Sequence, residues 1–209
     1  MRSYGQYCGL ARSLEVVGDR WNLLIVRELL VGPARYRDLI AGLPGVATNL
    51  LADRLRDLES AGVVERRLTG AGSVVEYALT PWGAELREPI EGLIRWSTPL
   101  MARGPADGDA FRPGWLALAL PALLDARVTE PPPVAIGIEV GDSPLRLSAT
   151  PAGFAVTPKD GRPLDATLRA EPAYILGLAA GAIPLDDART LGLIAIEGDE
   201  TAVRAAFGH

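Results

Sequence analysis

The sequence predicts an α+β protein, in which a helix-rich first half is followed by a second half of mixed strands and helices. Three observations predict this division. Apolar residues recur at helical spacing through much of residues 8–101, alternating apolar segments recur in residues 134–170, and a stretch rich in Gly, Pro and Asp separates the two regions. We therefore expect a first domain at residues 1–103, a linker at 104–112 and a second domain at 113–209.

The composition supports two globular units with different partners. Of the 209 residues, 48% are hydrophobic and 22% are charged, so the chain can bury a core. Residues 1–103 carry 13 Arg and 12 Asp or Glu, a net charge of +1, whereas residues 104–209 carry 8 Lys or Arg and 14 acids, a net charge of −6. A nucleic-acid partner of the first domain would therefore be held by locally clustered Arg and not by bulk charge.

Several classes of protein are disfavoured by the residue content. Apolar runs fall short of the roughly 18 residues of a membrane span, and residues 1–10 are too polar for a signal peptide, so we expect a cytoplasmic protein with no membrane partner. The single cysteine, Cys8, excludes an internal disulfide and a thiolate zinc site, and the single histidine, His209, is the last residue. We therefore expect no metal and no cofactor. We also expect no enzymatic activity, because the adjacent carboxylates Asp186 and Asp187 are more simply explained as a helix cap than as a catalytic pair.

Four helices and a hairpin are predicted in the first domain. Periodicity and breakers place the helices at residues 8–17, 21–30, 35–41 and 48–61. Strands at 63–68 and 74–79 are joined by a glycine-rich tip at 70–73. A short helix, a Gly/Pro turn, a longer amphipathic helix and a hairpin, in that order, predict a helix-turn-helix with a β-hairpin wing, which is typical of proteins that read duplex DNA.

The helix at residues 48–61 is the predicted reading helix, because its stripe of leucines leaves a polar face outward. Near its start, Thr48, Asn49 and Ala52 are expected to meet base edges, with Asn49 first because asparagine can pair bidentately with adenine. Arg54 and Arg56 fit either phosphate contacts or ion pairs with Asp57 and Glu59. The candidate DNA-binding residues are Arg35, Arg37, Thr48, Asn49, Ala52, Asp53, Arg54, Arg56, Arg66 and Arg67.

A further helix is predicted from Thr80 to about Met101, with Thr80 as its cap and a kink at Pro89. A long apolar stripe outside the small DNA-binding core predicts a homodimer interface. Packing of this stripe on the second domain is the alternative. The stripe contains Leu86, Ile90, Leu93 and Ile94, and Tyr4, Tyr7 and Leu10 would extend it.

The first domain resembles the HxlR family of bacterial transcriptional regulators over residues 4–101. The resemblance rests on Cys8 and on the segments LEVVGDRWNLLIVRELL (14–30), RYRDL (35–39), RLRDLE (54–59) and EYALT (76–80). It implies a homodimeric winged helix-turn-helix regulator, and two copies predict a pseudo-palindromic operator in double-stranded DNA. The chain departs from the family at Ala47, where Ser is frequent, and at Asp53, where an amide is frequent, so the operator sequence is not expected to transfer.

Cys8 falls where many of these regulators carry a cysteine, which some of them use to sense thiols or quinones. The resemblance therefore implies that Cys8 is a candidate redox residue. A sensor cysteine needs thiolate character and solvent access. A buried structural cysteine is the alternative.

The second domain is predicted to mix strands with helices. The expected helices are at 115–128, interrupted at Pro121, and at 172–180, 186–190 and 200–207; the expected strands are at 134–140, 145–149, 153–157, 166–170 and 193–197. Over residues 112–208 this domain resembles the sterol-carrier-protein type-2 domain. The resemblance rests on residues 170–172 (AEP), Leu176, Gly181, 188–189 (AR) and 192–199 (GLIAIEGD).

The second resemblance implies an α+β domain that encloses an apolar tunnel for lipids or other hydrophobic molecules. It therefore implies a hydrophobic small-molecule effector. A ligand cavity needs apolar walls with few polar groups. The candidate ligand-binding residues are Trp115, Leu118, Phe154, Tyr174, Ile175 and Leu178, each of which could equally be ordinary core.

Together these features predict a homodimeric, DNA-binding transcriptional regulator that a hydrophobic small molecule could gate. Two alternatives stay open. The chain could be a hydrophobic-ligand or lipid binding protein whose winged helix serves dimerisation, or a regulator that responds to oxidation of Cys8.

Overall fold

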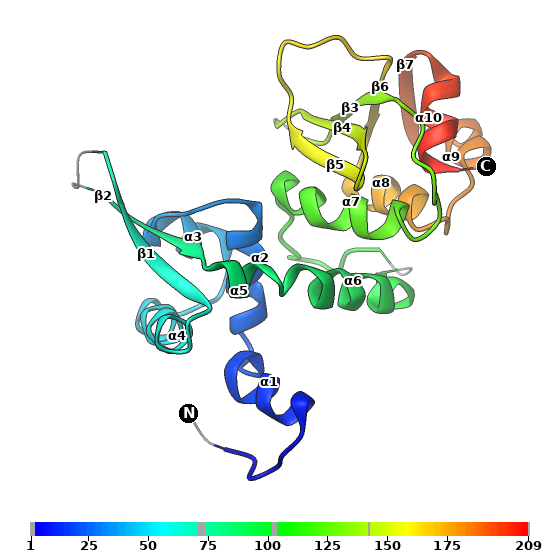
Figure 1. The fold of residues 1–209 in the computed structure, drawn as a ribbon. Helices are drawn as coiled ribbons and strands as arrows, with labels where there is room; N and C mark the ends of the chain where they lie inside the picture. Colours follow the sequence, from blue (N-terminus) through cyan, green and yellow to red (C-terminus); the bar gives the residue numbers. More distant parts are fainter. Residues whose placement is uncertain (1–2, 71–73, 102–103, 142, 209) are drawn as a thin grey trace. The chain divides into compact units, whose positions relative to one another are not determined.

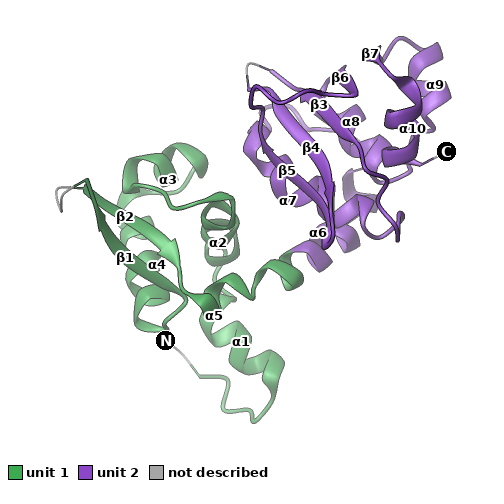
Figure 2. Cartoon of the chain, turned by 45° about the horizontal axis from the view of Figure 1, so that its top comes forward, with its two compact units in different colours: residues 1–90 green, residues 91–209 purple. Residues whose placement is uncertain are grey.

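The structure is a computed structural model that describes residues 3–70, 74–101, 104–141 and 143–208. It divides into two compact units, residues 1–90 and residues 91–209 (Figure 2). The boundary falls inside the helix α6 (Arg87–Met101), earlier than the composition change at 104–112. The later half of α6 belongs to the second unit because its Ile94 packs against that unit's hydrophobic core.

The first unit contains the predicted helices and hairpin in the predicted order (Figure 1). This order confirms the helix-turn-helix and wing. Two sequence features, residues 71–73 of the wing tip and His209, lie outside the described residues. The elements are α1 (Gly9–Val17), α2 (Asn22–Val31), α3 (Tyr36–Gly42), α4 (Thr48–Ser60), β1 (Val64–Thr69), β2 (Val74–Leu79) and α5 (Pro81–Ala84).

Helices α2 and α4 each supply three buried apolar side chains to the first unit's core. On α4, Leu51, Leu55 and Leu58 are at most 1% exposed, which confirms the predicted buried stripe. Spaced three and four residues apart, these side chains share one face of the helix, so the opposite face stays in solvent. Burying a leucine contributes about 1.5–3 kcal/mol, so this stripe fixes which face α4 presents outward.

The wing is an antiparallel pair in which Val64 lies opposite Leu79 and Leu68 opposite Val75. At the base of the hairpin, Val64 and Ala78 lie on opposite faces of the strand pair, and both are 2% exposed. Ala34 extends the sheet by one bridge to Tyr77, with two backbone hydrogen bonds of 3.0 and 2.8 Å. The hairpin is thereby anchored next to the start of α3.

The long helix expected after the wing is two helices, α5 and α6. Thr80 caps α5 as predicted, because its Oγ1 accepts a hydrogen bond of 3.0 Å from the backbone N–H of Gly83. The chain then leaves the helix at Glu85 and Leu86 before α6 begins. Pro89 explains the break: it has no N–H for the carbonyl of Glu85, and its ring would collide with that carbonyl in a continuous helix. The prediction of one kinked helix was therefore wrong.

The second unit is built on a five-stranded sheet in the order β5-β4-β3-β6-β7. Only the β3–β6 pair is parallel within this sheet; the other neighbours are antiparallel. The elements are η1 (Pro113–Trp115), α7 (Leu116–Leu124), β3 (Ala135–Glu139), β4 (Leu145–Thr150), β5 (Gly153–Pro158), β6 (Ala166–Ala170), α8 (Pro172–Ala179), α9 (Leu185–Thr190), β7 (Ile194–Gly198) and α10 (Glu200–Phe207). The α+β class is therefore confirmed for this unit as well.

Helix α7 packs on β5 and on α8, and α10 packs on β3 and β6. The sequence predicted a longer helix interrupted at Pro121, and that detail was wrong because α7 runs through Pro121 and ends at Leu124. The turn after the proline is retained, since the N–H of Asp125 donates to the carbonyl of Pro121 at 2.9 Å. Leu116, Leu120 and Leu124 are all fully buried, so packing compensates for the hydrogen bond that the proline cannot make.

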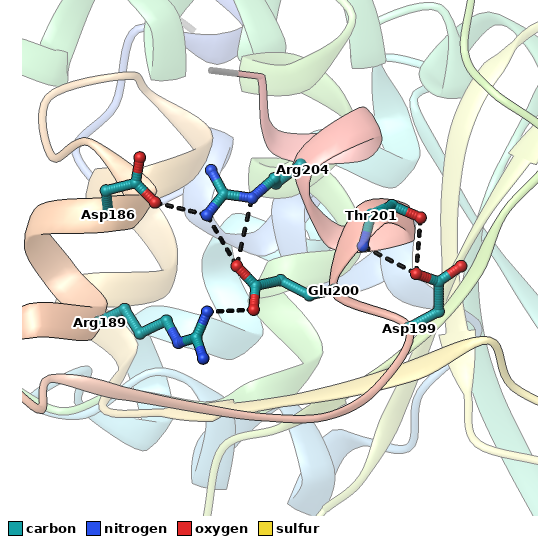
Figure 3. Close-up of polar contacts among 6 residues, drawn as sticks. All are labelled: Asp186, Arg189, Asp199, Glu200, Thr201 and Arg204. Atoms are coloured by element: carbon teal, nitrogen blue, oxygen red, sulfur yellow. Dashed lines mark hydrogen bonds and ion pairs between the residues drawn. The ribbon is translucent and has the colours of Figure 1, made fainter.

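An ion network joins α9 to α10 (Figure 3). Arg204 contacts Asp186 at 2.5 Å and Glu200 at 2.7 Å, and Arg189 contacts the other oxygen of Glu200. Asp186 was predicted to cap its helix, but Pro184 occupies the cap position of α9 and the carboxylate of Asp186 binds Arg204 instead. These acids therefore hold two helices together.

Asp199 caps α10 in the same region. Its Oδ1 accepts hydrogen bonds from the N–H of Thr201 at 2.8 Å and from the hydroxyl of Thr201 at 2.6 Å (Figure 3). A capping carboxylate satisfies an N–H that lacks a partner in the first turn and also interacts favourably with the positive end of the helix dipole.

Candidate nucleic-acid interface

Helix α3, a five-residue turn and helix α4 form the centre of the candidate interface. Gly45 in the turn has φ of +84°, a left-handed conformation that favours glycine. Leu43 in the same turn is 1% exposed and anchors it to the core. The hydroxyl of Tyr36 donates to the carbonyl of Thr48 at 2.5 Å, so the first turn of α3 is tied to the first turn of α4.

The outward face of α4 carries the residues predicted to read bases. Thr48 and Asn49 are exposed, and Ala52 and Asp53 are half-buried. The side-chain oxygen of Asn49 accepts a hydrogen bond of 3.0 Å from the N–H of Leu50. Pairing with adenine needs both the oxygen and the amino group of the amide, so Asn49 would have to turn away from its own backbone.

Ala47 precedes α4 as its cap residue and provides no side-chain hydrogen bond. A serine at that position would accept from one of the first N–H groups of the helix. With alanine there, the first turn of α4 lacks that partner. Backbone N–H groups at a helix N-terminus can donate to a phosphate oxygen.

Arg54 lies on the flank of α4 and not on its outward face. Its Nη1 contacts Oδ2 of Asp19 at 2.5 Å, and its Nη2 contacts Oδ2 of Asp57 at 3.2 Å. The side chain is 23% exposed, and its Nε is buried without a hydrogen-bond partner in the described structure. Of the two roles predicted for Arg54, the geometry favours the ion pair.

Asp19 was missed as a functional partner of the reading helix. It lies in the connection between α1 and α2, 35 residues before Arg54. Sequence periodicity reports contacts three or four residues apart on one helix, so it gives no signal for a pair at this distance along the chain.

The other candidate arginines, on the wing, at the start of α3 and on α4, are also paired with carboxylates of the same unit. Arg66 contacts Glu59 at 2.7 Å and stacks over the ring of Tyr77, with 5.8 Å from its guanidinium carbon to the ring centroid. The remaining pairs are Arg67 with Glu65 at 2.6 Å, Arg35 with Glu76 at 3.6 Å, Arg37 with Asp38 at 3.5 Å, and Arg56 with Asp53.

These pairs do not prevent contact with DNA. The side chains of Arg35, Arg37, Arg56, Arg66 and Arg67 are between 42% and 76% exposed. Exposed ion pairs contribute only about 0–1 kcal/mol each, so a phosphate can replace the carboxylate at small cost. The pairs do lower the positive potential of the surface, because each guanidinium faces an acid.

The six candidate ligand-binding residues of the second unit lie in or beside a packed core. Phe154, Ile175 and Leu178 are core members at 5%, 0% and 2% exposure, and Leu118 is 1% exposed. Tyr174 is partly buried against the same core. Trp115 is half-buried, and its ring meets Phe111 edge to face at 6.1 Å.

A hollow of about 400 Å³ lies elsewhere on the second unit. It is lined by Glu139, Gly141, Arg169, Ala170, Glu171, Gly192, Leu193, Ile194 and Ala195, and so by none of the six candidates. Two of the lining residues, Arg169 and Glu139, are neighbours on β6 and β3, and Arg169 donates hydrogen bonds of 2.9 and 2.7 Å to one oxygen of Glu139. The hydrogen bonds from Arg169 lower the pKa of Glu139.

Cys8 is a free, exposed cysteine at the cap position of α1. The alternative of a buried structural cysteine was therefore wrong, and the solvent access that a sensor thiol requires is present. Across the described ranges, no group of three or more His, Cys, Asp or Glu side chains could hold a metal ion. Within the same residues, every helix is too short or too polar to cross a membrane.

Comparison with known proteins identifies the first unit. A family model described as HxlR-like helix-turn-helix matches residues 16–104. The uncharacterized HTH-type transcriptional regulator YvaP of Bacillus subtilis is 34% identical over 88 residues, which make up 42% of this chain and 82% of YvaP. This chain belongs to the HxlR-like helix-turn-helix family.

A second relative is the HTH-type transcriptional regulator YodB of Bacillus subtilis. It is 33% identical over 86 residues, which make up 41% of this chain and 77% of YodB. The solved structure of reduced YodB covers 48% of this chain and 100% of its own, with 29% identity and a TM-score of 0.41. HxlR membership implies binding to DNA and regulation of transcription, and these matches each cover less than half of the chain.

Proposed function

We propose that this chain is a homodimeric transcriptional regulator that reads operator DNA with the outward face of α4. The observation that carries the proposal is the orientation of that face. The leucine stripe buries one side of α4 and leaves Asn49, Asp53 and Arg56 on the other. The exposed Arg35 and Arg37 at the start of α3 and Arg66 and Arg67 of β1 would hold phosphates, which fix position without reading sequence.

Two sets of exposed apolar side chains support a second copy of this chain as partner. On α6, Leu93, Trp96 and Leu100 are 47%, 74% and 69% exposed and share one helix face. On and before α1, Tyr4, Tyr7, Leu10 and Leu14 are 41–103% exposed. Clustered apolar side chains of this size usually mark an interface.

The predicted stripe on α6 divides between two roles. Ile94 packs against the second unit's core, which supports the alternative of packing on the second domain for that residue, and Ile90 is 6% exposed. Leu93 remains outward and is available to a partner. A symmetric dimer would place two α4 helices in successive major grooves, about 34–36 Å apart on a pseudo-palindrome.

The first experiment is a fluorescence titration of the duplex upstream of the chain's own gene, with a shuffled duplex of equal composition as reference. Wild-type protein should bind the natural duplex at least about 1,000-fold more tightly than the shuffled one. Arg56→Ala should weaken natural binding about tenfold or more. Arg162→Ala, which removes a side chain 65% exposed in the second unit, is the matched control and should leave binding unchanged. Equal affinity of wild type for both duplexes would reject the proposal.

We also propose that the second unit regulates DNA binding through a hydrophobic effector. Its support is a continuous apolar core between α7, α8 and the sheet. Leu118, Ile175 and Leu178 are at most 2% exposed, so a ligand must separate side chains that now touch. Coupling between effector and operator is typically about 1–3 kcal/mol. Native mass spectrometry of freshly purified protein tests this, and repeated absence of any bound small molecule would count against it.

The duplex titration, read together with this mass spectrometry, separates the regulator from a lipid-binding protein that only dimerises through its first unit. That alternative predicts retained ligand together with no sequence-selective DNA binding. Regulation through Cys8 also stays a prediction, supported by the exposure of the thiol. Mass spectrometry after mild peroxide, with Cys8→Ser as control, would reject it if Cys8 stayed unmodified and DNA binding did not change.

A further inference from the structure

The outward face of α4 carries one arginine, and an acid of the same face holds it. Arg56 donates from Nη2 to Oδ1 of Asp53, three residues earlier on the helix. The two side chains are 66% and 49% exposed, respectively. Arg54, the other arginine of α4, is held at the flank by Asp19 and does not share this face.

The pairing leaves donors and an acceptor free to contact a base pair. A guanidinium has five N–H donors, of which the Asp53 contact uses one, and a weak contact of 3.4 Å from Nε to the carbonyl of Ala52 uses another. The second oxygen of Asp53 is outside the pair. Helix α4 therefore presents two adjacent N–H donors of Arg56 beside one carboxylate acceptor of Asp53.

This combination matches the major-groove edge of one base pair. Guanine offers two acceptors, O6 and N7, which suit a bidentate arginine, and the cytosine amino group is a donor that suits a carboxylate. An A·T pair offers a methyl group and no such arrangement. The carboxylate also repels phosphates, so it weakens binding wherever the base contact cannot form.

We propose that Asp53 and Arg56 act together as the specificity-determining pair of α4 and select a G·C base pair in each half-site. Arg56 donates to O6 and N7 of guanine, and Asp53 orients Arg56 and accepts from the amino group of the paired cytosine. This inference rests on the proposed DNA-binding function and deepens it.

The test is selection of bound duplexes from a random-sequence library with the full-length protein and three variants. Asp53→Asn removes the charge and keeps the size of the side chain. Arg56→Lys keeps the charge and removes the bidentate fork. Asp57→Asn is the matched control, because it makes the same chemical change one turn along, at a residue paired with Arg54.

We expect the wild-type motif to contain a G·C pair that both Asp53→Asn and Arg56→Lys relax at the same position. Preference for G·C over A·T at that position should fall about tenfold in each variant, the order expected for one bidentate contact. Asp57→Asn should leave the motif unchanged, although its affinity for all duplexes should rise. Far-UV circular dichroism of each variant checks that the fold is retained.

The outcomes distinguish this inference from the function on which it rests. A wild-type motif that survives unchanged in both Asp53→Asn and Arg56→Lys overturns the role of the pair while leaving DNA reading intact. Relaxation at different positions in the two variants also overturns it, because the pair would not act on one base pair. Failure of the wild-type protein to enrich any motif rejects the proposed function and this inference together.

Discussion

Arg54 of α4 and Asp19 of the α1–α2 connection form an ion pair, with 2.5 Å between Nη1 and Oδ2. The pair joins the predicted reading helix to the turn that follows α1. Arg54 is only 23% exposed, in contrast to Arg56 at 66% on the same helix. One arginine of α4 therefore positions the helix, and the other is presented to solvent.

Loss of this pair should lower stability. Arg54→Ala leaves Asp19 and Asp57 without their shared cation, and we expect the free energy of unfolding to fall by about 1–2 kcal/mol. Urea unfolding followed by circular dichroism measures it. Arg37→Ala removes an arginine whose side chain is 76% exposed and should change stability by less than about 0.5 kcal/mol. Equal effects of the two substitutions would show that the Asp19 contact contributes nothing beyond a surface pair.

Replacing either of two glycines in the α5–α6 region by alanine should change the stability of the protein, but in opposite directions. A Cβ at Gly83 would lie 2.0 Å from the backbone carbonyl oxygen of Val63, so α5 and the hairpin would have to separate. Gly83→Ala should therefore destabilise the protein by about 1–3 kcal/mol. A Cβ at Gly92 meets only the tip of Arg95 at 3.9 Å, and Gly92→Ala should stabilise α6 by about 0.5–1 kcal/mol. Thermal unfolding of both variants tests the contrast, which a destabilised Gly92→Ala would contradict.

Acid should weaken the joint between α9 and α10. Hydrogen bonds from Arg204 lower the pKa values of Asp186 and Glu200, and hydrogen bonds from Thr201 lower the pKa of Asp199. Because these values are lower in the folded state, their stabilising effect is complete above the ordinary values of 3.8 and 4.5 and is lost as the pH falls through the lowered ones.

Unfolding in urea between pH 6 and pH 2 would measure this loss. Asp199→Asn keeps an accepting cap oxygen but cannot titrate, so its stability should depend less steeply on pH than that of wild type. Asp199→Ala should lower the free energy of unfolding by about 1 kcal/mol at neutral pH because the cap is lost. Identical pH profiles for wild type and Asp199→Asn would exclude Asp199 as a contributor.

The exposed face of α6 gives a direct test of the dimer. Trp96 is 74% exposed, and Trp96→Glu would place a charge in the middle of the proposed interface. Sedimentation should then show a monomer, whose affinity for a pseudo-palindromic duplex should be at least about tenfold weaker. Glu88→Gln, at an exposed position in the first turn of α6, is the control. A Trp96→Glu variant that stays dimeric would exclude this face as the interface.

The sequence predicted the first unit well because its signals are local. The leucine spacing of α4, the capping Thr80 and the residues flanking the wing each specify their own element, and the structure has them close to where they were expected. Which side chains of α6 are buried was less predictable. Ile94 and Leu93 are adjacent in the same apolar pattern, yet one packs against a core and the other is exposed, which only tertiary structure decides.

Long-range polar pairs were the main omission at the candidate site. The partners Asp19 and Arg54 are separated by 35 residues. Away from that site, in the second unit, Asp186 binds Arg204 although a helix cap had been expected there. Side-chain ion pairs have weak sequence signatures, because any exposed arginine can find several acids. The polar face of α4, in contrast, follows from the helical period alone and could be predicted.

The salt dependence of operator affinity tests the central claim most directly. Arginine–phosphate contacts release counterions, so the logarithm of the association constant should fall linearly with the logarithm of salt concentration, with a slope between about −4 and −9 for a dimer. Replacing Arg66 by Ala should make that slope shallower by about 2, one unit for each copy of the chain. A wild-type slope indistinguishable from zero would contradict binding of DNA by this face.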